Sequence, residues 1–435
     1  MASLLAFSCS FLDSKPTLLW TDTPEILIAA EMFNASRSRQ LIEVHYVENL
    51  AGTLRRPVEE GGIIPSIVIG KGLRTKALDR YFQSAENVFG ELVLPKDTFY
   101  PALLEGGKEG SRQVLIPVSF NLMLVMGRKE STRPSGMAEL DLPPANGGAI
   151  TMEEIQRRAV LFNGITKENG ERMGFSPRWP DRELLYQWIQ LTGADFGEAR
   201  TAQDRKNSNG EAFPVTWNPD GIENAAALLR AYVRDVNGSV AAEDAFAFKY
   251  LFAPGYKNVE AGKVLFAAMD SAAYFTLPPV ARSRYEYRYF SEKERLAVLE
   301  DIRYAGIPRR APNKETARQF LRWLFNPGHQ KDILEKSRGL RISESAFGVA
   351  GGFSSIRSVT EVVFPSYYTD LLGHIPPEDM VLPPRAFPDS WEKIKAEVIL
   401  PWLDEIAGKE AEPAANAELF SRMKAYLDRN PDFRP

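Results

Sequence analysis

The sequence predicts an α/β protein with two or three domains. Its 435 residues exceed what one typical core accommodates. Hydrophobic residues make up 44% of the chain and charged residues 25%, which is ordinary for globular proteins. Residues 16–70 alternate strand and helix patterns in the order β-α-β-α-β, which predicts a parallel sheet with helices on both faces.

The N-terminal alternation consists of short apolar runs separated by turn residues. Strands are predicted at residues 16–21, 41–47 and 65–70. The last of these, PSIVIG, is continuously apolar, which is typical of a strand buried on both faces. Thr23 is a good N-cap residue and Pro24 suits the first turn, so a helix is predicted from there toward Asn34. A second, short helix is predicted at residues 50–58.

The middle of the chain continues the alternation. Strands are predicted at residues 114–120, 121–127, 262–269 and 285–290, with strand-like residues at 172–175. Helical segments are predicted around Phe82 and Phe89 and at residues 99–104, 151–162, 179–191 and 218–236. Glu154 stands at capping-box spacing from Thr151. The polar residues 198–210 are interpreted as a surface excursion.

A predicted strand and an amphipathic helix follow one another in residues 302–328. Residues 302–307 form a predicted strand, and Asn313 is a predicted N-cap for the helix that follows. That helix carries one apolar stripe, expected in the core: Ala317, Phe320, Leu321, Leu324 and Phe325. A proline–glycine pair at 327–328 ends it. Beyond the turn-rich residues 339–358, helices are predicted at 391–406 and 414–427.

The order of these parts resembles the bacterial extracellular solute-binding proteins of family 1, the group of maltose-binding protein. The shared parts are a Trp-bearing first strand with a polar turn, the segment PSIV, the stretch 304–333, and PDSW before the closing helices. The resemblance covers nearly the whole chain after residue 15. It implies a periplasmic binding protein type II fold, with two α/β lobes joined by a hinge and a ligand cleft between them. The chain departs from the family pattern in having Ser66 in place of an acidic residue and no carboxylate at 117–121.

The resemblance also implies how the lobes divide the chain. The strand pair at 114–127 crosses from the first lobe to the second, and the stretch 304–333 returns. We therefore expect a first lobe of residues 13–120 plus 299–358, and a second lobe of residues 121–298 plus 359–435.

The N-terminal residues 1–12 are expected to be a lipoprotein signal remnant or tether. The run LLAFS leads into Cys9, the only cysteine, and resembles the end of a lipoprotein signal. This predicts lipidation of Cys9 and a periplasmic protein anchored to a membrane by lipid. The alternative is a frayed terminus with an incidental thiol. With one cysteine, no intramolecular disulfide can form.

Composition and motifs exclude several function classes. The net charge of −4, with both signs mixed, does not indicate a nucleic-acid partner. There is no G-x-S-x-G elbow, H-E-x-x-H pair or P-loop, so no catalytic residue is predicted. The three histidines, His45, His329 and His374, lie far apart, and neither a metal nor a cofactor is predicted. No apolar run reaches the ~18 residues that a membrane span needs.

Ligand-binding candidates follow two strands of the predicted parallel sheet. Asp22 and Thr23 come directly after the first strand, and Lys71 and Arg74 after the third. Ligands of open α/β sheets bind at the carboxyl ends of the strands, and free N–H groups at helix starts hold polar atoms. The alternatives are plain capping for Asp22 and Thr23, and a tight turn with an exposed lysine for residues 70–72.

The resemblance supplies further candidates on the loops that face the cleft. They are Trp20, Ser119, Asn121, Ser176, Arg178, Trp179, Asp270, Ser271, Tyr274, Ser354 and Trp391. Aromatic faces offer surface for the C–H groups of a sugar, and arginine offers paired donors. Several of these residues also have a structural alternative. Ser119 and Asn121 could be ordinary polar residues of a strand, Trp179 could belong to the core of its lobe, and the glycine-rich segment around Ser354 could be only a flexible connection.

These expectations combine into one predicted function. The chain would be the substrate-binding component of an ABC importer, a monomer that captures a sugar, oligosaccharide or polyol and docks on the transporter's membrane subunits. A phosphorylated or carboxylate ligand is an alternative, because the candidate residues include the cations Lys71, Arg74 and Arg178. Two alternatives remain: a two-domain α/β hydrolase or transferase, and a receptor that keeps the fold without a transport role.

Overall fold

The structure of the chain is a computed structural model that describes residues 16–37, 41–54, 63–129, 138–143, 148–165, 172–201, 212–409 and 414–434. The predicted tether and Cys9 lie outside these ranges, and the predictions for residues 50–58 and 198–210 are covered only in part.

The first of two large sheets has six strands in the order β15–β6–β14–β3–β1–β2. They are β1 (Thr17–Thr21), β2 (Ile42–Tyr46), β3 (Ile67–Gly70), β6 (Leu115–Phe120), β14 (Arg303–Gly306) and β15 (Phe353–Ser354). β1 pairs in parallel with β2 and β3, which confirms the predicted parallel start, whereas β14 runs antiparallel to β3 and β6. Every residue of β3 and β6 is buried, as expected for strands covered on both faces.

The second large sheet is mainly antiparallel, in the order β11–β7–β12–β13 with β8 beside β12. Its strands are β7 (Met123–Arg128), β8 (Ala149–Ile150), β11 (Phe266–Asp270), β12 (Tyr285–Glu292) and β13 (Arg295–Leu296). Lys293 and Glu294 form the turn between β12 and β13 with φ of 49° and 58°, as a two-residue type I′ turn requires. Two small sheets pair β4 (Lys108–Glu109) with β5 (Arg112–Gln113) and β9 (Gly197–Glu198) with β10 (Val215–Thr216).

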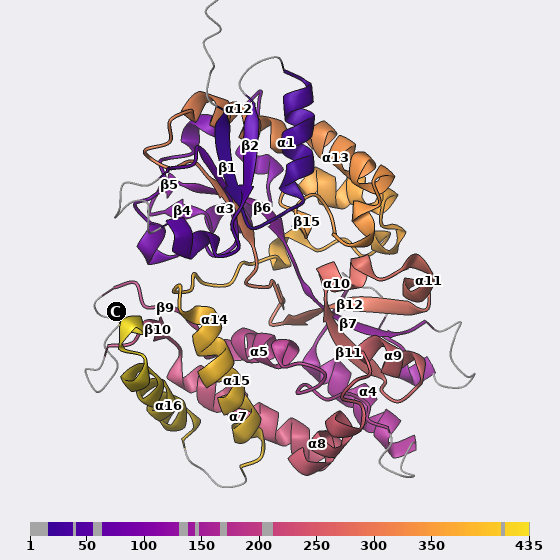
Figure 1. The fold of residues 1–435 in the computed structure, drawn as a ribbon. Helices are drawn as coiled ribbons and strands as arrows, with labels where there is room; N and C mark the ends of the chain where they lie inside the picture. Colours follow the sequence, from indigo (N-terminus) through magenta and orange to yellow (C-terminus); the bar gives the residue numbers. More distant parts are fainter. Residues whose placement is uncertain are drawn as a thin grey trace, which may run out of the picture.

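Two adjacent stretches of chain join the large sheets. β6 lies in the first sheet and β7 in the second, with only Asn121 and Leu122 between them. The chain returns between β13 and β14. The two crossings are paired, because the N–H of Met123 donates to the Ala297 carbonyl at 2.9 Å and the N–H of Leu299 to the Asn121 carbonyl at 2.9 Å. Figure 1 shows one lobe above the other with these crossings between them. The residue boundaries of the two lobes stay a prediction.

Helices surround both sheets (Figure 1). Around the first sheet lie α1 (Ile26–Ala35), α3 (Pro101–Glu105), α12 (Lys314–Leu324) and α13 (Pro327–Gly339). Around the second lie α4 (Met152–Ile165), α5 (Glu183–Ile189), α7 (Pro219–Tyr232), α8 (Val240–Lys249), α9 (Gly255–Glu260), α10 (Ser271–Thr276) and α11 (Pro279–Arg282). The C-terminal helices are α14 (Trp391–Ile394), continued by η13 (Lys395–Ile399) and α15 (Leu400–Ala407), and then α16 (Ala415–Arg429).

Helix α12 confirms the predicted apolar stripe. All five stripe residues have 0% exposure. Phe320 meets Phe33 of α1 edge-on, with the ring centroids 5.3 Å apart. The predicted cap of α4 is also confirmed, since the N–H of Glu154 donates to Oγ1 of Thr151 at 3.3 Å. These helices therefore follow local sequence rules.

One predicted cap is wrong and another is confirmed only in position. Helix α1 starts at Ile26 with Glu25 as its N-cap, and the Thr23 hydroxyl donates to Asp22 and accepts from Arg303 instead of capping the helix. Asn313 is the N-cap of α12, as predicted, and its carbonyl accepts from the N–H of Ala317 at 3.0 Å, but its side chain makes no capping hydrogen bond.

Two predicted helices are shorter than expected. Around Phe82 and Phe89 there are only three-residue turns, η1 (Lys76–Leu78) and η2 (Glu86–Val88). The backbone between them pairs elsewhere, since the N–H of Gln83 donates to the Ile307 carbonyl and that of Ala85 to the Gln113 carbonyl. The helix predicted at 179–191 starts only at Glu183, as α5, and continues as η6 (Gln190–Ala194); the proline at 180 accounts for the non-helical residue 179 before it.

The packing of α12 yields a test of the core. Replacing Leu321 with alanine is expected to lower the free energy of unfolding by about 2–5 kcal/mol, because the substitution leaves a cavity at a fully buried site. The matched control is Leu228→Ala in α7, at a leucine that is 41% exposed, which should change the free energy far less. Urea unfolding followed by circular dichroism measures both. Equal losses in the two variants would contradict the burial of the stripe.

Candidate functional site

The candidate site begins at the crossing between the sheets, at Asn121. Its side-chain amide donates to Oδ2 of Asp301 and to the Gly351 carbonyl, both at 2.9 Å. Its Oδ1 accepts from the Ser271 hydroxyl at 2.8 Å, and that hydroxyl accepts from the N–H of Leu122 at 3.1 Å. Asn121 is 1% exposed and Ser271 0%. The amide therefore links both crossings to α10 of the second lobe.

The same network continues into the first lobe through Arg303 at the start of β14. Arg303 donates to Oγ1 of Thr23 at 3.1 Å and approaches Asp301 at 3.4 Å. The Thr23 hydroxyl donates to Asp22 at 2.9 Å, and the other oxygen of Asp22 accepts from the N–H of Lys71 at 3.0 Å. Because β1 and β3 are parallel neighbours, their carboxyl ends bring Asp22 and Lys71 together as the sequence predicts.

Three carboxylates interact electrostatically near this network: Asp181, Asp270 and Asp301. Burial raises the pKa of Asp270, the N–H of Ala273 at 2.7 Å opposes that shift, and Asp301 and Asp181 add to it. Burial likewise raises the pKa of Asp181. Negative charge is therefore concentrated where the first and second lobes meet, and groups that donate hydrogen bonds would relieve it.

Two buried polar atoms at the site have no partner among the described residues. They are Nε1 of Trp20, a donor, and Oδ1 of Asp301, an acceptor. An unpaired buried polar atom costs about 1–3 kcal/mol, so each is a place where a bound hydroxyl or water would gain a hydrogen bond.

Trp391 is placed in a buried cluster rather than on an open surface. It is 3% exposed, its ring stacks on Phe387 at 4.5 Å, and its Nε1 donates to Glu300 at 2.7 Å. Glu300 also accepts from the hydroxyl of Tyr186 and from Lys395 at 3.2 Å. Burial raises the pKa of Glu300; burial acts to lower the pKa of Lys395, but Glu300 and Glu183 outweigh it and raise that pKa.

Arg178 is likewise held within the second lobe. Its guanidinium reaches Glu243 at 3.1 Å, Asp244 at 2.9 Å and Asp404 at 3.4 Å. The side chain of Arg178 is 9% exposed and that of Glu243 only 1%. Its neighbours in sequence are also buried, since Ser176 is 3% and Trp179 7% exposed, and Trp179 packs edge-on against Phe246. This segment binds its own lobe through paired charges.

The other candidates divide by exposure. Ser119 donates to the Ala350 carbonyl at 2.7 Å, Ser354 donates to Gln330 at 2.7 Å, and Tyr274 is fully buried against Tyr287. Lys71 is exposed, and the half-buried candidates are Trp20, Asp22, Arg74, Arg178 and Asp270. Ligand contact by any of the predicted residues stays a prediction.

Sequence reasoning missed Asp301 and Arg303. They flank Ile302, which is 3% exposed, at the start of a strand that enters the first sheet. A charged–apolar–charged alternation directly at the return crossing was the available signal. It was not distinctive, because the network that gives the two residues a role joins them to Asn121 and Thr23 across at least 180 positions of sequence.

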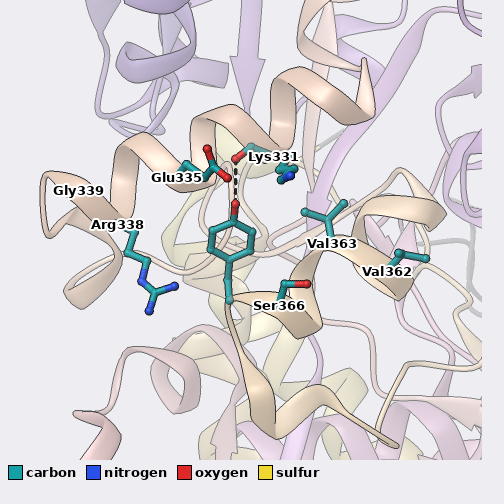
Figure 2. Close-up of a pocket in the computed structure, with 8 residues that line it drawn as sticks. Lys331, Glu335, Arg338, Gly339, Val362, Val363 and Ser366 are labelled. Carbon is teal, nitrogen blue, oxygen red and sulfur yellow. Dashed lines mark hydrogen bonds between the residues drawn. The ribbon is translucent and has the colours of Figure 1, made fainter.

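A surface depression lies elsewhere in the described part of the chain. It has a volume of about 700 Å³ and is lined by residues of α13 and of the segment after β15. Figure 2 shows Glu335, Arg338 and Lys331 on the helix, opposite Val362, Val363 and Ser366. None of the predicted ligand-binding residues lines it, so this depression is separate from the candidate site.

Sequence comparison does not identify the chain, whereas comparison of structures does so at the level of fold. No family model matches, and no curated protein matches by sequence. A cyclic alpha-maltosyl-1,6-maltose binding protein from Arthrobacter globiformis matches with a TM-score of 0.62 at 16% identity, over 94% of this chain and 100% of that one. The chain has the fold of a type II periplasmic binding protein. This confirms the predicted fold class.

Two further structures extend the likeness. An extracellular solute-binding protein of family 1 from Alicyclobacillus acidocaldarius matches with a TM-score of 0.60 at 14% identity, over 96% of this chain and 99% of that one. An ABC substrate-binding protein from Listeria monocytogenes, in complex with cycloalternan, matches with a TM-score of 0.57 at 12% identity, over 96% and 98%. Among the described residues of this chain, no helix is long and apolar enough to cross a membrane.

Substitution of Arg178 distinguishes a structural role of this residue from direct contact with a ligand. Arg178→Ala is expected to lower the free energy of unfolding by about 3–5 kcal/mol, because it leaves Glu243 buried without its partner. The control is Arg234→Ala, which removes an arginine from an exposed pair with Asp235 and should leave stability unchanged. Chemical denaturation measures both. A stable Arg178→Ala protein with weakened ligand binding would instead support the direct contact predicted from sequence.

Proposed function

We propose that this chain is the substrate-binding component of an ABC importer and captures a carbohydrate or related polar solute between its two lobes. The observation that carries the proposal is the continuous polar network from Lys71 and Asp22, through Arg303 and Asp301, to Asn121 and Ser271. It spans the first lobe, both crossings and the second lobe. The solved neighbours, which include a cyclic maltosyl-maltose binding protein and a complex with cycloalternan, support a sugar as the ligand.

The mechanism follows from the two paired crossings. A ligand that touches polar groups of both lobes stabilises the arrangement in which those groups are close, by its differential affinity for that arrangement. Rotation about the short connections at residues 121–122 and 297–302 would open and close the cleft without unfolding either sheet. The closed form would then dock on the importer's membrane subunits, and no bond of the ligand is broken.

The polar groups of the candidate site favour hydroxyls over phosphates. Asp22, Asp270 and Asp301 accept hydrogen bonds, and the indole N–H of Trp20 donates one beside an apolar ring. A sugar hydroxyl both donates and accepts, so it matches this mixture. Of the three cations that kept a phosphorylated ligand open, Arg178 is neutralised by three carboxylates. We therefore favour a neutral sugar, oligosaccharide or polyol.

Binding of maltotriose, a cyclic tetrasaccharide, sorbitol and glucose 6-phosphate tests the proposal. We expect at least one neutral carbohydrate to raise the melting temperature and to bind in titration calorimetry, with no turnover product. Asp22→Asn should weaken that binding about 10-fold or more, because a hydrogen bond to a charged group is worth about 1.5–3 kcal/mol. The matched control, Asp235→Asn, lies on the exposed surface of the second lobe and should bind like the wild type.

Two outcomes would contradict the proposal. Binding of glucose 6-phosphate alone, with no neutral carbohydrate bound, would reject the neutral-sugar assignment. Hydrolysis or transfer detected by chromatography of the incubated sugars would replace the importer role with an enzymatic one.

A further inference from the structure

A loop of the first lobe touches the second lobe at a place separate from the crossings. Lys76 begins the turn η1, six residues after β3 ends, and Glu198 belongs to β9 in the second lobe. The N–H of Lys76 donates to both carboxylate oxygens of Glu198, at 3.0 and 2.9 Å. The Lys76 ammonium donates to the Arg200 carbonyl at 2.5 Å. These contacts join segments 122 and 124 positions apart.

An ion pair reinforces the same contact. Arg200 donates to Asp79 of the first lobe at 3.0 Å and to Glu198 of its own lobe at 3.1 Å. The guanidinium therefore lies between carboxylates from both lobes. The side chain of Glu198 is 8% exposed, whereas those of Asp79 and Arg200 are 29% and 40% exposed. The contact is buried at its centre and open to water at its rim.

The second-lobe half of the contact is held in place by its own neighbours. The N–H of Glu198 donates to the Ala386 carbonyl at 2.7 Å, and Arg385 donates to the Asp195 carbonyl at 3.1 Å. Glu198 also pairs with Val215 of β10. Because its backbone is fixed in this way, the Glu198 carboxylate is presented to Lys76 in one position, and forming the contact orders few additional groups.

The contact lies on the ligand side of the first lobe. The loop that carries Lys76 and Asp79 follows β3, and its first residue, Lys71, already donates its N–H to Asp22 of the candidate site. Between the two, Arg74 donates to the carbonyl of Pro384 at 3.1 Å. A small cavity of about 50 Å³ lies where Arg74, Asp79, Arg200 and Ala386 meet. The two lobes are therefore in direct contact at this place.

We propose that Lys76, Asp79, Glu198 and Arg200 form a latch that holds the lobes together in the unliganded protein. Opening of the cleft requires the latch to break, so the latch sets the fraction of molecules that is already closed. A ligand whose final complex is closed binds more tightly when that fraction is larger, because the apparent Kd equals the intrinsic Kd divided by it. This effect on affinity rests on the proposed function, whereas the effect on shape does not.

Small-angle scattering of the unliganded protein tests the latch directly. Arg200→Ala and Asp79→Ala should each give a larger radius of gyration than the wild type. The double variant should be no larger than either single variant, because all three remove the same ion pair between Arg200 and Asp79 and keep the contact of Lys76 with Glu198. The wild type should also expand at 1 M salt, which shortens the range of the charge interaction to about 3 Å. Arg234→Ala, at an exposed pair distant in sequence from the latch, is the control and should match the wild type.

The result that overturns the latch is an unliganded wild type with the same radius of gyration as both single variants at low salt. Melting curves of the variants check that they remain folded, as expected from the partial exposure of both side chains. A carbohydrate found in the preceding screen should bind the Arg200→Ala protein roughly 10-fold more weakly. Expansion of the variants without any sugar binding would keep the latch and reject the importer role. If the variants bind the sugar with the wild-type affinity and keep the wild-type radius of gyration, the latch is rejected and the importer role is kept.

Discussion

The structure depends on one constraint: the chain passes between two sheets at a buried point, and the polar groups there need partners. Asn121 meets this constraint with its side-chain amide, which donates twice and accepts once. Only an amide side chain combines two donors on one nitrogen with a neighbouring acceptor oxygen. The crossing is therefore a joint with specific hydrogen-bond partners, rather than an arbitrary linker between two domains.

The candidate site is an extension of that joint. Asp301, which Asn121 holds, approaches Arg303, and Arg303 in turn orients Thr23 and Asp22 at the end of β1. Groups that would face a ligand are thus connected to groups that would move when the lobes rotate. A two-state element of this kind is what ligand-driven closure needs, because contacts at the site change the relative stability of the two arrangements. The latch at Glu198 acts on the same equilibrium from the outer edge of the cleft.

Charge and aromatic character alone did not separate binding residues from structural ones. Arg178 and Trp391 have the chemistry expected of sugar-binding side chains, yet each is buried against structural partners: Arg178 pairs with Glu243, and Trp391 donates to Glu300 at the return crossing. A buried arginine needs carboxylates and a buried indole needs an acceptor. The side chains that remain accessible at the joint, such as Asp22 and Asp270, are distinguished by their surroundings and not by their type.

The sequence by itself determined the α/β class, the parallel start of the first sheet, the apolar stripe of α12 and the order of parts that led to the fold. These features depend on periodicity and turn residues, which act over a few positions. Only the tertiary structure decided the partners of Arg178, the role of Asp301 and Arg303, and the contact of Lys76 with Glu198. Those interactions join residues 65 to 280 positions apart, and no local pattern encodes which distant charge a side chain will meet.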